Sequence, residues 1–152
     1  MSITETDHIV IVVKDIEEGI RSWRDGLGLS LSHTVDQADA GIRQAFFSLQ
    51  DGTFIELIAP AHDDSPVAGI VASRGEGVHV VALTVDDLDA TIEKLQERGV
   101  KLIGVGTPQV FIHPKSANGV MIQLWPKDRA HRWKASPNEA VQQQNTGVQN
   151  DV

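Results

Sequence analysis

Two short β-branched runs dominate the hydrophobic pattern of the chain. Residues 7–16 (DHIVIVVKDI) and residues 79–88 (HVVALTVDDL) are apolar at most inner positions, and each reaches an aspartate, Asp15 or Asp87. Runs of this kind are typical of strands that are covered on both faces. A helical pattern follows each aspartate, which predicts a helix N-cap at both places. The pattern therefore predicts two similar units.

The first unit is predicted to contain one helix and three strands, or four if an edge strand is present. The helix is indicated by apolar residues at helical spacing after the first cap, namely Ile16, Ile20, Trp23 and Leu27. Residues 42–49 and 53–58 are predicted to form a hairpin around an Asp-Gly turn. Between helix and hairpin, residues 29–33 favour a short edge strand and residues 36–41 a polar loop.

The second unit repeats this order after a join at residues 60–77. Within the join, Ser65-Pro66 predicts the start of a short helix, because proline is tolerated in a first helical turn. The apolar spacing after Asp87 predicts a helix that Gly99 ends. The strands of this unit are expected at 79–85, 101–103, 110–113 and 120–125. Such self-similarity indicates two half-sheets side by side, which would curl into a cup.

Residues 128–152 differ from the rest of the chain. This segment is polar, rich in Gln and Asn, and without hydrophobic periodicity, which predicts a disordered tail. The remaining residues, 1–127, are expected to form one domain, with modules at 5–60 and 77–126 joined by 61–76.

Composition excludes several classes of function. The 152 residues suit one domain, and a net charge of -8 argues against a nucleic-acid partner, since no basic face can neutralise phosphates. With no cysteine, neither disulfides nor thiolate chemistry is available. The N-terminus lacks the features of a signal peptide, and no apolar run approaches the ~20 residues of a membrane span. We therefore expect a soluble cytoplasmic protein without a membrane partner.

Polar residues stand at matching places in the two units. Aligning Asp15 with Asp87 puts His8 opposite Val80. The similar closing strands put Glu56 opposite Gln123. An unpaired buried carboxylate or amide costs about 1–3 kcal/mol, so these groups need partners in the cup. The apolar wall around these groups is expected to consist of the side chains of Val10, Val80, Phe54 and Trp125.

Two alternatives for His8 and Glu56 follow from their residue types. Imidazole and carboxylate suit first-row divalent metals, so the pair is a plausible half of a metal site. Equally, the two side chains would hydrogen-bond to each other inside a ligand cup. In the other half, Gln123 is a weak ligand and Val80 cannot bind a metal at all. His79 is one residue away from the needed position and would face the cup only through a β-bulge.

These residues resemble a known family, the vicinal oxygen chelate superfamily, and within it the methylmalonyl-CoA epimerases. The resemblance runs from about residue 5 to 126. It rests on these motifs: DH at 7–8, ELIAP at 56–60, SPVA at 65–68, GEGVH at 75–79, VDDL at 85–88 and HPKS at 113–116. It implies an α+β fold, in which two βαβββ modules side by side form a cupped eight-stranded mixed sheet with helices outside.

The resemblance also implies a divalent metal, such as cobalt or manganese. Its ligand positions match His8, Glu56, Val80 and Gln123. Carboxylates of the epimerases move the proton of the substrate; one matches Gln123, and some bacterial epimerases carry another acidic residue at the position of Gln44. Because the amides of Gln44 and Gln123 have no usable proton affinity, an epimerisation by two carboxylates does not carry over. Val80 also replaces a ligand, so any metal is expected to be weakly bound or absent.

The resemblance implies an isomerase that moves a proton next to the carbonyl of an acyl-CoA or related carboxylated substrate. Its candidate catalytic residues are Glu56, His8, Gln44 and Gln123. His113 is expected either to contact a polar head group of the substrate or to lie in an ordinary solvated hairpin. The alternatives are a non-catalytic binding or sequestering protein of the drug-resistance type, and a metal-free lyase or isomerase. Relatives often form homodimers, which is the expectation here.

Overall fold

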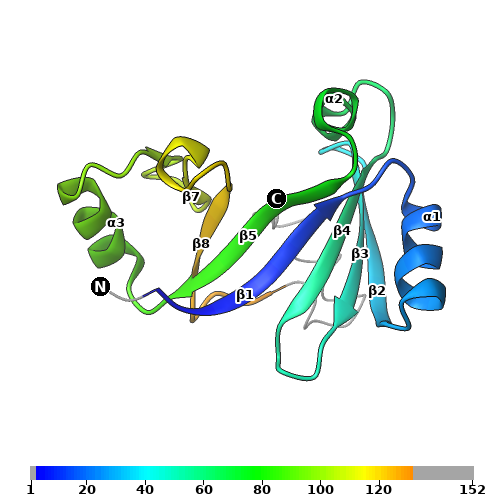
Figure 1. The fold of residues 1–152 in the computed structure, drawn as a ribbon, viewed down its shortest axis with the longest axis horizontal. Coiled ribbons are helices and arrows are strands. Elements are labelled where there is room, and N and C mark those ends of the chain that lie inside the picture. Colours follow the sequence, from blue (N-terminus) through cyan, green and yellow to red (C-terminus); the bar gives the residue numbers. More distant parts are fainter. Residues whose placement is uncertain (1–2, 132–152) are drawn as a thin grey trace.

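The computed structural model describes residues 3–131 of the chain, and Figure 1 shows their arrangement. Eight strands form one mixed sheet in the order β2-β3-β4-β1-β5-β8-β7-β6. The predicted α+β fold with a repeated module is confirmed. Most of the predicted disordered tail, residues 132–152, lies outside the described residues.

Each module follows the predicted order of strand, helix and three strands. The first contains β1 (Ile3–Val12), α1 (Ile16–Ile20), β2 (Ser30–Gln37), β3 (Ile42–Ser48) and β4 (Phe54–Pro60). The second contains β5 (Gly77–Val85), α3 (Leu88–Glu97), β6 (Leu102–Ile103), β7 (Val110–Ile112) and β8 (Ile122–Pro126). Between them lies α2 (Pro66–Arg74). None of the helices in the described part is long and apolar enough to cross a membrane.

The two modules meet at the antiparallel pair β1 and β5 in the middle of the sheet. In this pair His8 lies opposite Ala82, and Val10 lies opposite Val80. If His8 is equivalent to Val80 and Val10 to Ala82, exchanging the modules converts one pair into the other. The register therefore has the approximate two-fold symmetry that the alignment of the aspartates implied.

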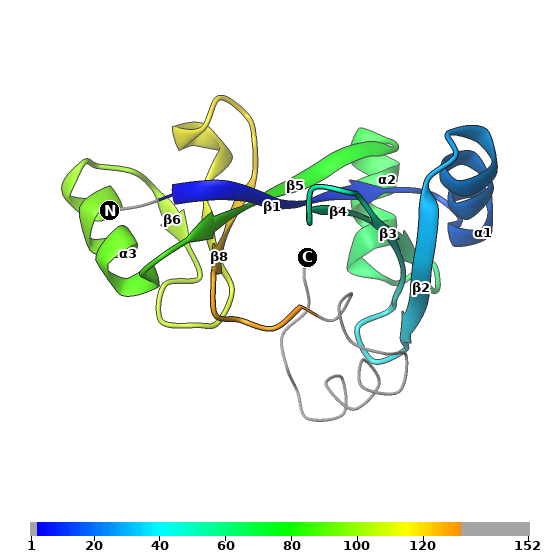
Figure 2. The ribbon, with the colours of Figure 1, turned by 90° about the horizontal axis from the view of Figure 1, so that it is seen from below.

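The sheet has two differently covered faces, because successive side chains of a strand point to opposite sides. On the outer face, α1 packs through Ile16 and Ile20 in a cluster that includes Leu57, and α3 packs through Leu95 against Leu124. Figure 2 shows these two helices at opposite ends of the sheet, which curves toward the other, concave side. There α2 contributes Val67 to an apolar cluster of the concave face.

The helix caps formed as predicted, each with an aspartate or serine side chain accepting a backbone N–H. Asp15 accepts from Glu18 at 2.9 Å, and Asp87 accepts from Ala90 at 3.0 Å. Ser65 likewise accepts from the N–H of Val67. These bonds satisfy donors that a helix start leaves without an intrahelical partner.

The predicted helical stripe that ends at Leu27 is wrong in its last turn. After α1 the chain continues as a π-helical segment, Arg21–Gly26, and Leu27 is 64% exposed. A π-helical turn is wider than an α-helical turn, so it moves later residues around the helix axis. Trp23 still packs against the outer cluster.

The predicted edge strand at 29–33 and polar loop at 36–41 also need correction. The strand β2 extends through Gln37, because every second residue, His33, Val35 and Gln37, is buried. Only residues 38–41 form the turn into β3. The second hairpin is shorter than predicted: β7 ends at Ile112 and β8 begins at Ile122.

Candidate functional site

The concave face brings the predicted polar residues together. His8, Glu56 and Gln123 are all 0% exposed, although each is a polar residue within an apolar strand. Glu56 lies on β4 opposite Val10 of β1, which puts it two residues beyond the partner of His8. Gln123 lies on β8 opposite Ala82, the equivalent place in the second module.

The apolar wall comes from both modules. Phe54, Val80 and Trp125 are at most 2% exposed, and Val80 packs with Val10 in the cluster on the concave face. The ring of His8 stacks on Phe54 with 4.5 Å between ring centroids and contacts Trp125 edge-on at 5.5 Å. The plane of the His8 imidazole is therefore held by neighbours from β4 and β8.

Gln44 orients Glu56 rather than carrying a proton itself. Its Nε2 donates a hydrogen bond of 3.2 Å to Oε2 of Glu56, and its Oε1 accepts from Nε2 of Gln37. All three side chains are buried. This amide chain fixes the direction of the Gln44 amide and gives the carboxylate a donor on one side.

His8 has a second set of contacts through Asp7. Nδ1 of His8 lies 2.7 Å from Oδ2 of Asp7, and Nε2 of His131 lies 2.6 Å from the same oxygen. The hydroxyl of Thr84 donates to the other oxygen, Oδ1, at 3.3 Å. The Asp7 carboxyl group thus joins β1, β5 and the segment after β8.

These contacts determine the charge of Asp7. Burial alone would raise the pKa of its carboxyl group, but hydrogen bonds from His131 and His8 and the charges of both imidazoles lower the pKa well below its ordinary value overall. Asp7 is therefore an ionised, acceptor-only carboxylate at neutral pH.

Two polar groups of the concave face keep unused hydrogen-bonding capacity. Within the described part of the chain, Nε2 of His8 and both polar atoms of the Gln123 amide are buried without a hydrogen-bond partner. A buried polar group without a partner costs about 1–3 kcal/mol, so such atoms indicate a place for a ligand.

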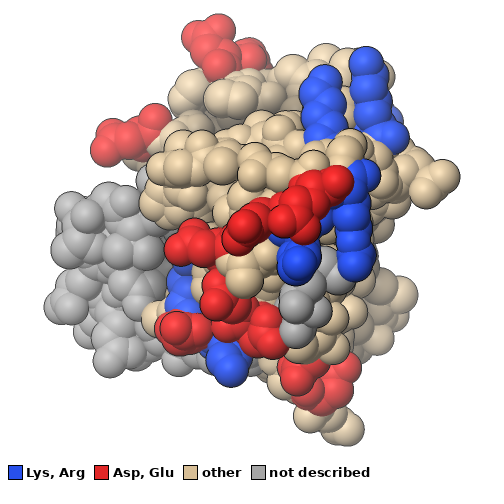
Figure 3. Space-filling model, turned by 90° about the vertical axis from the view of Figure 1, so that its left-hand side faces the viewer, with Lys and Arg blue, Asp and Glu red and all other residues tan. Residues whose placement is uncertain are grey.

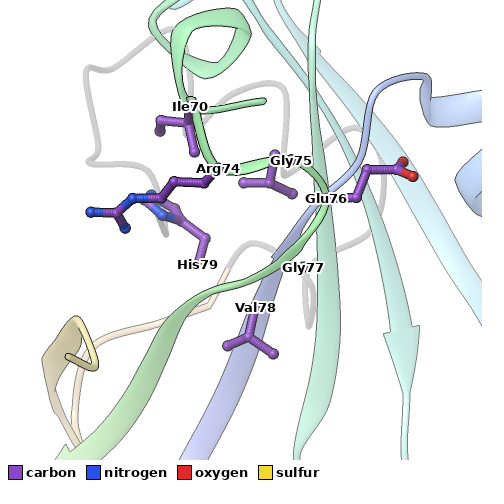
Figure 4. Close-up of a pocket in the computed structure, with 8 residues that line it drawn as sticks. Ile70, Arg74, Gly75, Glu76, Gly77, Val78 and His79 are labelled. Atoms are coloured by element: carbon purple, nitrogen blue, oxygen red, sulfur yellow. The ribbon is translucent and has the colours of Figure 1, made fainter. Parts of the chain in front are cut away.

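His79 does lie at a β-bulge. The register of β1 and β5 passes from Val10 and Val80 to Ile11 and Val78, which leaves His79 unpaired in the ladder. Figure 4 shows its ring beside Arg74 in a small pocket. Burial and the neighbouring Arg74 lower the pKa of His79. His79 therefore lies beside Arg74, whereas Val80 packs in the apolar cluster of the concave face.

His113 is the N-cap of a short 3₁₀ turn, Pro114–Ser116. Its Nδ1 accepts the backbone N–H of Lys115 at 2.9 Å. Partial burial lowers the pKa of His113, and the charges of the neighbouring Lys101 and Lys115 lower it further. Its contact with a substrate head group stays a prediction.

The four ligand positions implied by the resemblance do not fit a tight divalent metal site. Val80 supplies no donor atom and belongs to an apolar cluster, and Gln123 is a neutral amide. One imidazole and one carboxylate remain as strong ligands. A different group, Asp7, His8 and His131, has three potential ligand atoms within 4.8 Å, but two of the contacts have hydrogen-bond distances.

The sequence pattern does not identify Asp7, Gln37, Thr84 and His131 as members of this region. It predicts a loop at Gln37 and a tail from residue 128 that includes His131. Yet His131 is only 8% exposed, and its ring stacks on Trp125 with centroids 4.6 Å apart. The one feature of the sequence that could have indicated its role is its ring, which stands beside Arg132 in an otherwise polar segment.

The side of the molecule that Figure 3 displays, where α3 lies, shows no continuous basic area. Acidic side chains there lie beside lysines and arginines. Together with the net charge of -8, this gives no support to a nucleic-acid interface on that face.

Comparison with known proteins gives consistent results. An ethylmalonyl-CoA/methylmalonyl-CoA epimerase of Cereibacter sphaeroides is 32% identical over 127 residues, which are 78% of this chain and 94% of the relative. The mitochondrial methylmalonyl-CoA epimerase of Homo sapiens is 30% identical over 126 residues, 78% of this chain and 71% of the relative.

Solved structures agree in fold. The methylmalonyl-CoA epimerase of Mycobacterium tuberculosis has a TM-score of 0.69 and 34% identity, covering 91% of this chain and 93% of that one. A variant of the Streptomyces coelicolor enzyme bound to 2-nitronate-propionyl-CoA has a TM-score of 0.70 and 30% identity, covering 84% and 100%. The family model of the glyoxalase/bleomycin resistance protein/dioxygenase superfamily matches residues 7–116. The chain belongs to this superfamily.

Proposed function

We propose that this protein is an epimerase-like isomerase that moves a proton next to the carbonyl of an acyl-CoA or a related carboxylated substrate. The observation that carries the proposal is the burial of an imidazole, His8, and a carboxyl group, Glu56, on adjacent strands of the concave face. Relatives that are named methylmalonyl-CoA epimerases support the substrate class.

The reaction needs one group to take a proton and another to return one. Nε2 of His8 takes the proton from the acidic carbon, and the electron pair of the broken C–H bond moves into the carbonyl to give an enolate. Glu56, in its protonated form, returns a proton to the opposite face of that carbon. For the other stereoisomer the two roles are exchanged, so the overall reaction consumes no co-reactant.

The enolate oxygen requires a hydrogen-bond donor in a site that excludes water. The Gln123 amide is buried without a partner among the described residues, so its N–H₂ is available to this oxygen. Phe54, Val80 and Trp125 form the apolar surroundings that strengthen such a bond. Gln44 holds Glu56 through the hydrogen bond to Oε2.

We propose that this proton transfer does not depend on a tightly bound metal, because two of the four implied ligand positions hold valine and an amide. Elemental analysis of the purified full chain should then find less than one first-row metal per protein. One tightly bound metal per chain would contradict this part of the proposal.

The test of the reaction is deuterium exchange at the acidic carbon of methylmalonyl-CoA and other acyl-CoA compounds in heavy water. Exchange and racemisation of at least one of them are expected. If every compound fails to exchange, with and without added cobalt or manganese, the proposed isomerase is wrong.

A second candidate is a binding protein without turnover, as in the drug-resistance branch. It is favoured by the amide Gln123, where the epimerases have a glutamate, and by the amide Gln44, where some bacterial epimerases are acidic. Ligand-induced increases in melting temperature without any exchange or product would support it. A homodimer remains a prediction for either function, and sedimentation of the full chain would test it.

A further inference from the structure

The segment after β8 returns to the concave face and adds a residue to the site. Figure 2 shows it running from the second module toward the first on the concave side. The Trp125 indole donates from Nε1 to the Arg129 carbonyl at 3.3 Å, and the Arg129 guanidinium lies 5.0 Å from the indole centroid. His131 then lies between modules, 4.6 Å from Trp125 and 5.6 Å from Phe54 by ring centroids.

Asp7 is able to face this segment because of a β-bulge. The pairing of β1 with β5 passes from Thr6 opposite Leu83 directly to His8 opposite Ala82, so Asp7 has no partner in the ladder. A bulge re-aims side chains and places Asp7 within reach of both imidazoles. The equivalent bulge residue of the second module is His79. A carboxylate therefore stands at the bulge of the first module and not at that of the second.

The hydrogen bonds around Asp7 determine which nitrogen of His8 is available. Nδ1 of His8 and Nε2 of His131 both face Oδ2 of Asp7, and an oxygen that accepts from both nitrogens requires Nδ1 of His8 to be the proton-bearing donor. In the neutral ring Nε2 then keeps its lone pair, and this is the atom that is buried without a partner among the described residues. That tautomer is the one a base in the cup needs.

We infer that Asp7 and His131 are positioning residues for His8, and this inference rests on the proposed function, in which His8 is the base. Asp7 holds the Nδ1–H tautomer of His8 and stabilises the imidazolium that forms when Nε2 takes the substrate proton. His131 donates to the same oxygen of Asp7 from the C-terminal segment and fixes the carboxylate, together with the Thr84 hydroxyl. Neither residue contacts the reacting carbon.

The contact distances favour shared protons over a bound metal at these three residues. Separations of 2.7 Å and 2.6 Å between nitrogen and oxygen are those of charge-assisted hydrogen bonds.

The first test is the tautomer of His8 in the free protein, which requires no substrate. Two-bond ¹H–¹⁵N correlation spectra of ¹⁵N-histidine-labelled full chain identify the protonated ring nitrogen, and His8→Gln assigns the signal among six histidines. Protonated Nδ1 with bare Nε2 is expected, and Asp7→Asn should raise the fraction protonated at Nε2. A wild-type His8 protonated at Nε2 overturns the inference.

The second test is the rate of exchange on the best acyl-CoA substrate. Asp7→Asn should lower turnover by about 10²–10⁴-fold with little change in KM, as for the orienting aspartate of a catalytic triad. His131→Gln should lower turnover by about tenfold, the lower end for outer partners of functional histidines. The exposed His62→Gln is the matched control and should have no effect.

The two tests separate this inference from the proposed function. If the wild type shows the expected tautomer but exchanges no acyl-CoA, the isomerase is wrong and the hydrogen-bonded trio stands. If the wild type exchanges and His131→Gln behaves as His62→Gln, the role of His131 is wrong. Should Asp7→Asn fail to fold, the wild-type tautomer and the His131→Gln rate still decide.

Discussion

The two modules share a backbone arrangement but differ in the chemistry of their concave faces. The first contributes His8 and Glu56, whereas the equivalent places of the second hold Val80 and Gln123. Both sets are buried to nearly the same extent. The difference teaches that the repeat maintains the shape of the cup, while its acid–base groups come from one module.

The symmetry also fails at the bulges. Asp7 and His79 are equivalent in register, but Asp7 joins two imidazoles and a hydroxyl, whereas His79 lies beside Arg74. A nearby positive charge stabilises an ionised carboxylate but disfavours a protonated imidazole, so the two bulges suit different neighbours. The carboxylate–imidazole network of the concave face is therefore centred on the bulge of β1.

The largest expected effect comes from removing the carboxyl group of Glu56, the acid–base carboxyl group that the first module places on the concave face. Glu56→Gln keeps the shape of the side chain but loses its proton transfer, so the racemisation rate should fall by about 10²–10⁴-fold, whereas His8 can still exchange the proton of one stereoisomer. Chiral separation of the two stereoisomers measures racemisation, and mass spectrometry measures exchange in parallel. Glu97→Gln, an exposed glutamate on α3, is the control. An unchanged racemisation rate in Glu56→Gln would place the acid–base chemistry elsewhere.

The second prediction concerns the metal-ligand position that Val80 leaves without a donor atom in the second module. Val80→His puts an imidazole opposite His8 in the approximate symmetry and should raise cobalt affinity by at least about tenfold. Calorimetric titration measures the affinity, with Val81→His on the other face of β5 as control. Equal affinity in both variants would show that the side chain of residue 80 does not face a metal position.

A third prediction concerns the parts that the modules share. Asp15→Ala and Asp87→Ala each remove the acceptor of one N-cap and should each lower the free energy of unfolding by about 1 kcal/mol. Urea unfolding measures both. Neither change should alter the exchange rate by more than the change in folded fraction. A selective loss of exchange in one variant would contradict the view of the caps as purely structural.

The smallest predicted effect is on the pH dependence of stability. Because folding lowers the pKa of Asp7 below its ordinary 3.8, its contribution is present above that pH and is lost as pH falls toward the lowered value. The stability difference between wild type and Asp7→Asn should therefore shrink below about pH 4. His8, His131 and Thr84 face this carboxyl group. A difference that grows on acidification would contradict the sign.

Much of the fold could be predicted because its signals are local. The caps Asp15, Ser65 and Asp87 and the β-branched strands lie within short stretches of sequence. The repeat shows that Glu56 and Gln123 occupy equivalent positions in the two modules. The π-helical segment before Leu27 could not be predicted, since helical spacing alone does not distinguish the wider turn.

The site was less predictable because it depends on contacts between distant residues. The bulge at Asp7 arises from the register of β1 on β5, about 75 residues away in sequence. The position of His131 depends on stacking against Trp125, which no periodic pattern records. The direction of Glu56 depends on Gln37, whose burial follows from the length of β2.

The central claim is that the first module alone supplies the proton-transfer groups, without a tightly bound metal. Its most direct measurement is the racemisation of methylmalonyl-CoA by protein that a chelator has freed of metal. Racemisation that Glu56→Gln abolishes and Glu97→Gln retains is the predicted result. Racemisation that begins only when one equivalent of cobalt or manganese is restored would contradict the claim.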